Sequence, residues 1–245
     1  MEPIFRHTFL LDDIYLDSFG RLKPSSILYF IQEAAGHHCK LLQVDWDTLA
    51  KQSLFWAVTR HRVQITRLPT RGETITVETW PMPTTRVAYP RCVIAYDTEG
   101  KELFRSVSLW VLMDLESRAL VLPGKSGVDV GGTLIGNELS VPHSLAPKEL
   151  KNTATRTVTY TCLDRNGHMN NTHYPDMLCD FTENILTKRV TGMTLSFLHE
   201  GAYGHTLKVL RREGEEGRTF FRTLNESGET CLEAVLTFEP IAKED

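Results

Sequence analysis

Two short stretches of this sequence match each other and decide how the whole chain folds. The first reads Tyr15-Leu16-Asp17-Ser18-Phe19-Gly20-Arg21-Leu22, and the second reads Cys162-Leu163-Asp164-Arg165-Asn166-Gly167-His168-Met169. At an offset of 164 − 17 = 147 residues, a leucine, an aspartate and a glycine recur in the same places. Since a helical pattern follows each stretch, we interpret them as the same point in two copies of one structural unit.

The match continues further along the chain at a smaller offset. Residues 58–77 can be laid over residues 190–209, an offset of 190 − 58 = 132, which brings Gly72 to Gly204 and Val77 to Val209. The smaller offset means that the first copy has a longer helix or a longer exit from it. The ordered series of matches predicts a duplication.

Each copy has the pattern of a helix followed by strands. Apolar residues recur at helical spacing over Ser25–Gln43 and over Thr172–Thr187. The strand patterns then fall at residues 63–65, 74–79, 88–96 and 103–113 in the first copy, and at residues 193–198, 206–210, 218–224 and 231–238 in the second. This order predicts an α+β unit in which an antiparallel sheet wraps round a long helix. We expect domains at residues 1–122 and 148–245, joined by a linker at residues 123–147 that is rich in Gly, Pro and Ser.

The composition narrows the classes of function. The 245 residues are 41% hydrophobic and 24% charged, which is typical of a globular protein. The net charge of −4 argues against nucleic acid as a main partner. No stretch reads as a membrane span, and Met1–Leu11 lacks the apolar core of a signal peptide. Five cysteines without CxxC spacing indicate free thiols in a reducing compartment, so we expect a cytoplasmic protein without a zinc ribbon.

The stretch in the second copy carries groups suited to catalysis. Asp164, Asn166 and His168 alternate in a loop that ends at a predicted helix N-terminus. Alternate side chains of an extended segment share one face, and backbone N–H groups at a helix N-terminus suit an oxyanion. The loop alone is equally compatible with a polar turn whose side chains only cap the backbone, with Asn171 as the N-cap of the helix.

Comparison of the two copies favours a catalytic role for this loop over a purely structural one. The first copy keeps the aspartate and the glycine but has Phe19 in place of Asn166 and Arg21 in place of His168. A shared turn explains the retained residues, but it does not explain an amide and an imidazole that occur together in one copy only. Later in the chain Glu200 falls opposite Leu68. We expect Glu200 at the end of an apolar strand, where a solvated charge is the alternative interpretation.

These residues resemble the acyl-acyl carrier protein thioesterases of plants and bacteria, which have two tandem hotdog domains. The resemblance covers almost the whole chain. It rests on Asp164-x-Asn166-x-His168-x-Asn170-Asn171-x-x-Tyr174 and on Thr194-Leu195-Ser196-Phe197-Leu198-His199-Glu200. It implies a double hotdog in which the first domain holds the acyl chain and the second supplies the catalytic Asp164, Asn166, His168 and Glu200. Plant members often have a cysteine after the glutamate, where this chain has Gly201.

The expected activity is hydrolysis of fatty acyl-[acyl carrier protein] thioesters. Asp164 would act as base or nucleophile, Asn166 would orient it or the carbonyl, His168 would shuttle the proton, and Glu200 would fix the imidazole or position water. No metal or organic cofactor is implied. The partners would be acyl carrier protein and its acyl chain, and a homodimer is left open. The alternatives are an acyl-CoA thioesterase, a hotdog hydratase or dehydratase, and a non-catalytic acyl-binding module.

Three further groups each have two interpretations. Glu33, His37 and His38 lie on the first predicted helix and either bind a metal or border its surface. Trp46, Phe55 and Trp56 either line an acyl pocket or belong to the core. The basic stretch consists of Arg60, Arg62, Arg67 and Arg71, and it either faces an acidic carrier protein or carries ordinary exposed charges.

Overall fold

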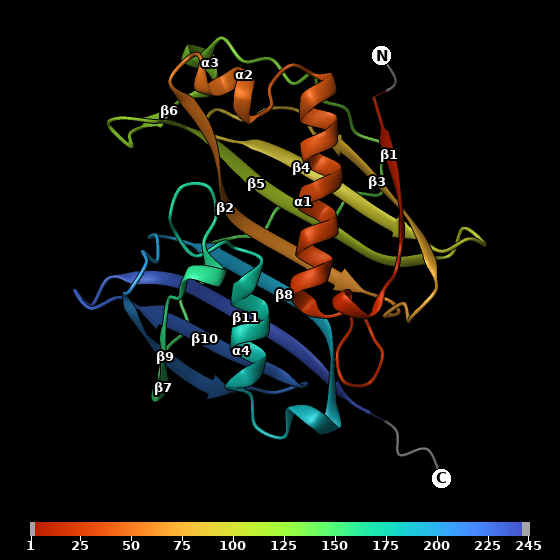
Figure 1. Ribbon diagram of the computed structural model, residues 1–245, viewed down its shortest axis with the longest axis vertical. Helices are drawn as coiled ribbons and strands as arrows, with labels where there is room; N and C mark the ends of the chain where they lie inside the picture. Colours follow the sequence, from red (N-terminus) through yellow and green to blue (C-terminus); the bar gives the residue numbers. More distant parts are fainter. Residues whose placement is uncertain (1–2, 242–245) are drawn as a thin grey trace. The chain divides into compact units, whose positions relative to one another are not determined.

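The computed structural model describes residues 3–241. The chain forms two compact units, Met1–Pro142 and His143–Asp245 (Figure 1). The boundary lies inside the segment that we expected to be a linker. None of the helices formed by residues 3–241 has both the length and the apolar character that a membrane crossing needs.

The first unit is an antiparallel sheet with one long helix. Its sheet has the order β1-β3-β4-β5-β2, and the short β6 pairs with β5. The elements are β1 (Phe5–Leu10), a 3-10 turn (Asp13–Tyr15), α1 (Pro24–Leu41), α2 (Trp46–Ala50), β2 (Leu54–Ile65), β3 (Thr74–Pro81), β4 (Tyr89–Tyr96), β5 (Glu102–Asp114), β6 (Leu120–Val121) and α3 (Pro123–Ser126).

Helix α1 is held to its sheet by one apolar face. Pro24 occupies its first turn, where a missing N–H is tolerated. Figure 1 shows α1 running across one face of the sheet. Ile27, Phe30 and Ile31 are fully buried there, and the rings of Phe30 and Phe9 lie 4.5 Å apart. Burial of each such side chain stabilises the fold by roughly 1.5–3 kcal/mol, so tertiary packing fixes the helix.

The second unit repeats this plan with a shorter helix. Its sheet has the order β8-β11-β10-β9-β7, and all its pairs are antiparallel. The elements are β7 (Lys151–Thr157), a 3-10 turn (Tyr160–Cys162), α4 (His173–Asp180), a second 3-10 turn (Ile185–Thr187), β8 (Lys188–Phe197), β9 (Thr206–Glu213), β10 (Arg218–Leu224) and β11 (Thr230–Pro240). The predicted α+β class is therefore confirmed for both units.

The hydrogen bonds of the backbone repeat at the two predicted offsets, which confirms the duplication. Leu22 N donates to Pro69 O at 3.0 Å, and Met169 N donates to Gly201 O at 2.8 Å. The same correspondence holds for three further pairs of bonds, namely Lys23 N→Tyr15 O with Asn170 N→Cys162 O, Leu11 N→Glu73 O with Val158 N→His205 O, and Gly72 N→Leu11 O with Gly204 N→Val158 O. We call this shared set of backbone hydrogen bonds the backbone frame. The two units have the same backbone frame but carry different side chains on it.

Several predicted boundaries differ from the structure. The helix predicted over Thr172–Thr187 ends at Asp180, because the chain turns at Asn184, whose φ of 53° is left-handed. Strands β1 and β7 were not predicted, and β2 begins at Leu54, well before residues 63–65. The expected linker also contains the short helix α3.

Candidate active site

The loop before α4 holds the Asp164 carboxylate through the backbone. Oδ1 accepts hydrogen bonds from the N–H groups of Asn166 at 2.8 Å and His168 at 3.3 Å. Oδ2 faces the side-chain amide of Asn166, whose Nδ2 donates at 3.4 Å. Gly167 has a φ of 78°, a left-handed conformation that glycine adopts without strain. One carboxylate oxygen is therefore fixed, and the other lies beside an amide.

The strand exit of β8 brings Glu200 to the same loop. His168 forms an isolated β-bridge with Ala202, next to the bond from Met169 N to Gly201 O. As a result His168 Nε2 lies 3.2 Å from Glu200 Oε2, and the two side chains are 25% and 50% exposed. The structure thus brings the four predicted residues close together: Glu200 contacts the His168 ring, while Asp164 contacts the backbone N–H of His168 and the side chain of Asn166.

The contact with Glu200 assigns different roles to the two ring nitrogens of His168. When the neutral ring donates its Nε2 proton to the carboxylate, Nδ1 is the atom that accepts a proton. Nδ1 is buried and has no hydrogen-bond partner within residues 3–241. The arrangement therefore combines an oriented imidazole with a carboxylate that is held in place, the two kinds of group that general acid–base chemistry needs.

Tyr174 of α4 is a neighbour of this site to which we had given no role. Burial raises the pKa of its hydroxyl, and the charges of Cys231 and Glu200 raise it further. The hydroxyl oxygen lies 3.1 Å from the position that a Cβ on Gly201 would take. A side chain at position 201 would therefore press on Tyr174. The signal in the sequence was the tyrosine that ends the signature, combined with a glycine after Glu200.

Asn171 does not cap α4, so this part of the alternative interpretation of the loop is wrong. The N-cap residue is Thr172, whose φ of −65° and ψ of −25° are already helical, and no side chain caps the helix. Asn170 Oδ1 instead accepts hydrogen bonds from the N–H and the hydroxyl of Thr172, at 3.0 and 3.1 Å. Asn171 Oδ1 is buried and has no hydrogen-bond partner in the described part of the chain.

In the first unit an arginine forms an ion pair with Asp17, the residue that corresponds to Asp164. Asp17 Oδ1 accepts the N–H groups of Phe19 and Arg21 at 2.8 and 3.0 Å, as Asp164 does in its own loop. Asp17 Oδ2, however, accepts Nε and Nη2 of Arg21 at 3.1 and 2.8 Å. The two turns share a backbone, but the first uses its aspartate in a bidentate ion pair, and Leu68 stands in the place of Glu200.

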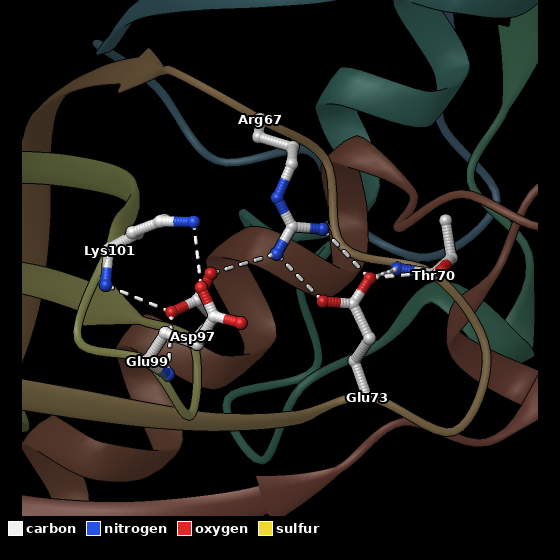
Figure 2. Close-up of polar contacts among 6 residues, drawn as sticks. All are labelled: Arg67, Thr70, Glu73, Asp97, Glu99 and Lys101. Atoms are coloured by element: carbon white, nitrogen blue, oxygen red, sulfur yellow. Dashed lines mark hydrogen bonds and ion pairs between the residues drawn. The ribbon is translucent and has the colours of Figure 1, made fainter.

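The first unit also contains an ion-pair network of Arg67, Glu73 and Asp97, which we call the clamp (Figure 2). Arg67 donates to both carboxylate oxygens of Glu73 at 2.8 and 2.7 Å and to Asp97 at 3.3 Å. Those bonds from Arg67, together with bonds from Thr70, lower the pKa of Glu73 to about 2. At the offset of 132, the second unit has His199 and His205 in place of Arg67 and Glu73. The second unit therefore has no counterpart of this arginine–glutamate pair at these two positions.

For the basic stretch, the structure favours ordinary exposed charges over a surface for a carrier protein. Arg71 pairs with Asp13 at 2.9 Å, and Arg67 belongs to the clamp just described. Arg60 donates to Pro142 O at 3.2 Å, and Arg62 donates to Ser140 Oγ at 2.7 Å. All four guanidinium groups thus have partners inside the first unit, which weakens the case for a basic surface dedicated to a carrier protein.

The other two groups have contacts within the first unit. No cluster of three or more His, Cys, Asp or Glu residues within residues 3–241 could hold a metal ion. Glu33 pairs with His37 at 3.4 Å, while His38 is buried against Arg91, with Nδ1 3.2 Å from Nη1. Trp56 donates to Val44 O at 2.8 Å and packs against a buried cluster.

Comparison with known proteins identifies the family. Residues 2–122 match the model of the acyl-ACP thioesterase N-terminal domain, and residues 145–240 match the model of the acyl-ACP thioesterase C-terminal domain. The chain therefore belongs to the acyl-ACP thioesterase family.

Curated relatives and solved structures agree with this. A palmitoyl-acyl carrier protein thioesterase of Cuphea hookeriana is 24% identical over 91% of this chain and 63% of its own length. A dodecanoyl-[acyl-carrier-protein] hydrolase of Umbellularia californica is 25% identical over 84% of this chain and 59% of its own length. The chain thus spans less than two thirds of these relatives.

The fold resembles two solved structures over nearly their full length. An acyl-ACP thioesterase from Bacteroides thetaiotaomicron superposes with a TM-score of 0.88 at 23% identity, covering 97% of this chain and 98% of that one. The 12:0-ACP thioesterase from Umbellularia californica superposes with a TM-score of 0.82 at 22% identity, covering 98% and 99%.

Proposed function

We propose that this protein hydrolyses fatty acyl thioesters of acyl carrier protein to a free fatty acid and the carrier thiol. The observation that carries the proposal is the contact between His168 Nε2 and Glu200 Oε2 at 3.2 Å, on the loop that holds Asp164. The family membership and the curated relatives support acyl carrier protein as the carrier. A cytoplasmic location stays a prediction.

The reaction assigns a task to each residue. Asp164 either removes a proton from the attacking water or attacks the thioester carbonyl directly with Oδ2. Asn166 orients Asp164 Oδ2 or the carbonyl oxygen through its amide. Glu200 holds the imidazole, and His168 delivers a proton to the sulfur as the carbon–sulfur bond breaks. In both routes water supplies the oxygen of the acid and the proton of the thiol.

The two units divide this work. We propose a double hotdog, with the acyl chain held by residues 1–122, a linker at residues 123–147, and the catalytic residues in 148–245. The long α1, packed on its own sheet, supports the first part, and the restriction of Asn166, His168 and Glu200 to one copy supports the second. The two similar solved structures support the architecture.

The decisive experiment compares matched aspartates. Asp164→Ala or His168→Ala should lower kcat with a fatty acyl-ACP substrate by on the order of 10² or more, because a positioned base or proton donor is lost. The control variant is Asp17→Ala, which removes the corresponding aspartate of the first unit. It should leave kcat almost unchanged and lower the unfolding free energy by about 1 kcal/mol, since only turn and ion-pair contacts disappear. Equal loss of turnover from Asp17→Ala and Asp164→Ala in folded protein would refute the one-sided site.

The carrier is tested in the same assay. Thiol release should be faster from acyl-ACP than from acyl-CoA with the same acyl chain. A preference for acyl-CoA would keep the hydrolase and replace the proposed carrier. Hydration of an enoyl thioester without thiol release would instead indicate a hydratase.

A further inference from the structure

Two tyrosines stand exposed beside the candidate active site. Tyr160 is 79% exposed and Tyr203 is 64% exposed, in a unit whose large apolar side chains are mostly buried. Tyr203 directly follows Ala202, the bridge partner of His168. Tyr160 begins the 3-10 turn that leads into the loop, and its carbonyl accepts the N–H of Leu163, the neighbour of Asp164. Both backbone positions are therefore fixed relative to the catalytic loop.

The first unit shows what these positions hold when no catalysis is required. At the same two offsets Tyr160 corresponds to Asp13 and Tyr203 corresponds to Arg71. Asp13 and Arg71 form an exposed ion pair, with Nε 2.9 Å from Oδ1. The backbone between the two positions is held alike in both units, because Gly72 N→Leu11 O and Gly204 N→Val158 O both measure 2.9 Å. The same backbone arrangement thus forms with two charged side chains at these positions, so it does not require aromatic residues there.

Neither tyrosine ring has a ring partner or a cation over it within residues 3–241. Tyrosine is enriched among the residues that anchor binding partners, since it offers a wide apolar face and a hydroxyl at low entropic cost.

We propose that Tyr160 and Tyr203 bind the pantetheine arm of the thioester substrate. This rests on the proposed function. The arm ends in the reacting sulfur and carries two amides and a branched apolar segment, so an aromatic face and a phenol hydroxyl match its chemistry. The turns that carry the two tyrosines are joined by backbone contacts to the loop that holds Asp164. Acyl carrier protein and coenzyme A both present this arm.

The test removes the tyrosines and shortens the arm. The double variant Tyr160→Ala with Tyr203→Ala is assayed with one acyl chain carried as the pantetheine thioester and as the N-acetylcysteamine thioester, which lacks the branched segment. We expect kcat/KM for the pantetheine thioester to fall about tenfold, mainly through KM, as for loss of an aromatic anchor. The value for the N-acetylcysteamine thioester should stay within about twofold.

The matched control is Asp13→Ala with Arg71→Ala in the first unit, which should leave the ratio of the two substrates unchanged. The acyl-ACP and acyl-CoA substrates extend the test, and both should weaken by the same factor as the pantetheine thioester. Loss with acyl-ACP alone would mean that the tyrosines contact the carrier protein, which overturns the proposal. An equal loss with N-acetylcysteamine would also overturn it, because the rings would then only support the site. Wild-type protein inactive on all four thioesters would refute the proposed function itself.

Discussion

Buried histidines of the first unit respond to pH. His61 of β2 is 3% exposed and lies edge-to-face on Trp110, with ring centroids 6.3 Å apart. Burial lowers its pKa from 6.5 to about 4. Burial and the neighbouring Arg91 lower the pKa of His38 to about 4 as well. Both rings are neutral in the folded protein at pH 7, whereas the unfolded chain binds their protons below pH 6.5.

This difference predicts how stability changes with pH. Between pH 6.5 and pH 4 the unfolded state binds more protons, so the unfolding free energy should fall as the pH is lowered. His61→Phe should remove roughly 3 kcal/mol of that fall, because the group that titrates only in the unfolded chain is gone. Urea unfolding at several pH values measures it. An unchanged slope in His61→Phe would contradict the argument.

At the level of single residues, the sequence predicted the components of the site but not all of their contacts. Asp164, Asn166 and His168 lie within five positions, so local geometry was enough to bring them together, and the repeat located Glu200. Tyr174 against Gly201 could not be predicted, because this contact depends on how α4 packs on the strand exit. The N-cap at Asn171 was wrong because Asn170 satisfies the backbone of Thr172 instead.

Among the elements, the strands with alternating burial were the predictable ones. Strand β10, residues 218–224, matches its predicted range, and its burial alternates along the strand. Strand β7 is exposed on both faces, so it has no apolar pattern that could reveal it. The second helix was predicted too long because the apolar spacing continues through Ile185 and Leu186, although the chain has already left the helix.

The clamp between β2, the turn before β3 and the turn after β4 makes a prediction at this scale. Because Arg67 holds the pKa of Glu73 near 2, the ion pair stabilises the fold above about pH 4.5, the ordinary pKa of the group, and is lost as the pH falls toward 2. Glu73→Gln should lower the unfolding free energy at pH 7 by about 1 kcal/mol, since solvent screening limits a partly exposed pair.

The difference in unfolding free energy between Glu73→Gln and wild type should become smaller at lower pH. Urea unfolding at several pH values from 5 to 2.5 measures it. Glu99→Gln provides the control, because its pair with Lys101 at 2.7 Å is largely exposed on both sides. It should change stability little at any pH. A Glu73→Gln effect that stays constant down to pH 2.5 would show that packing, and not charge, holds this corner.

Across the whole molecule, the thiols are distributed over both units, and burial makes three of them poor nucleophiles. All five cysteines are free. Burial raises the pKa of Cys92 to about 12 and that of Cys231 to about 11, and it also raises the pKa of Cys39. Attack on a thioester needs a thiolate, which these three positions disfavour at neutral pH. Position 201, next to Glu200, is a glycine.

A variant with all five cysteines replaced by alanine should therefore keep its turnover. Its stability should fall, because the buried positions lose packing, so thiol release is measured only after circular dichroism shows a folded protein. Treatment of the wild type with iodoacetamide provides a second measurement and should also leave activity unchanged. A folded cysteine-free protein without turnover would show that a thiol takes part.

The shared backbone frame of the two units has a consequence for protein engineering. Three substitutions, Phe19→Asn, Arg21→His and Leu68→Glu, would place the counterparts of Asn166, His168 and Glu200 around Asp17. The first copy already has the backbone hydrogen bonds that would hold these side chains in place. Turnover measured for this triple variant in an Asp164→Ala background would report how much of the rate comes from the four side chains and how much from the unit that surrounds them.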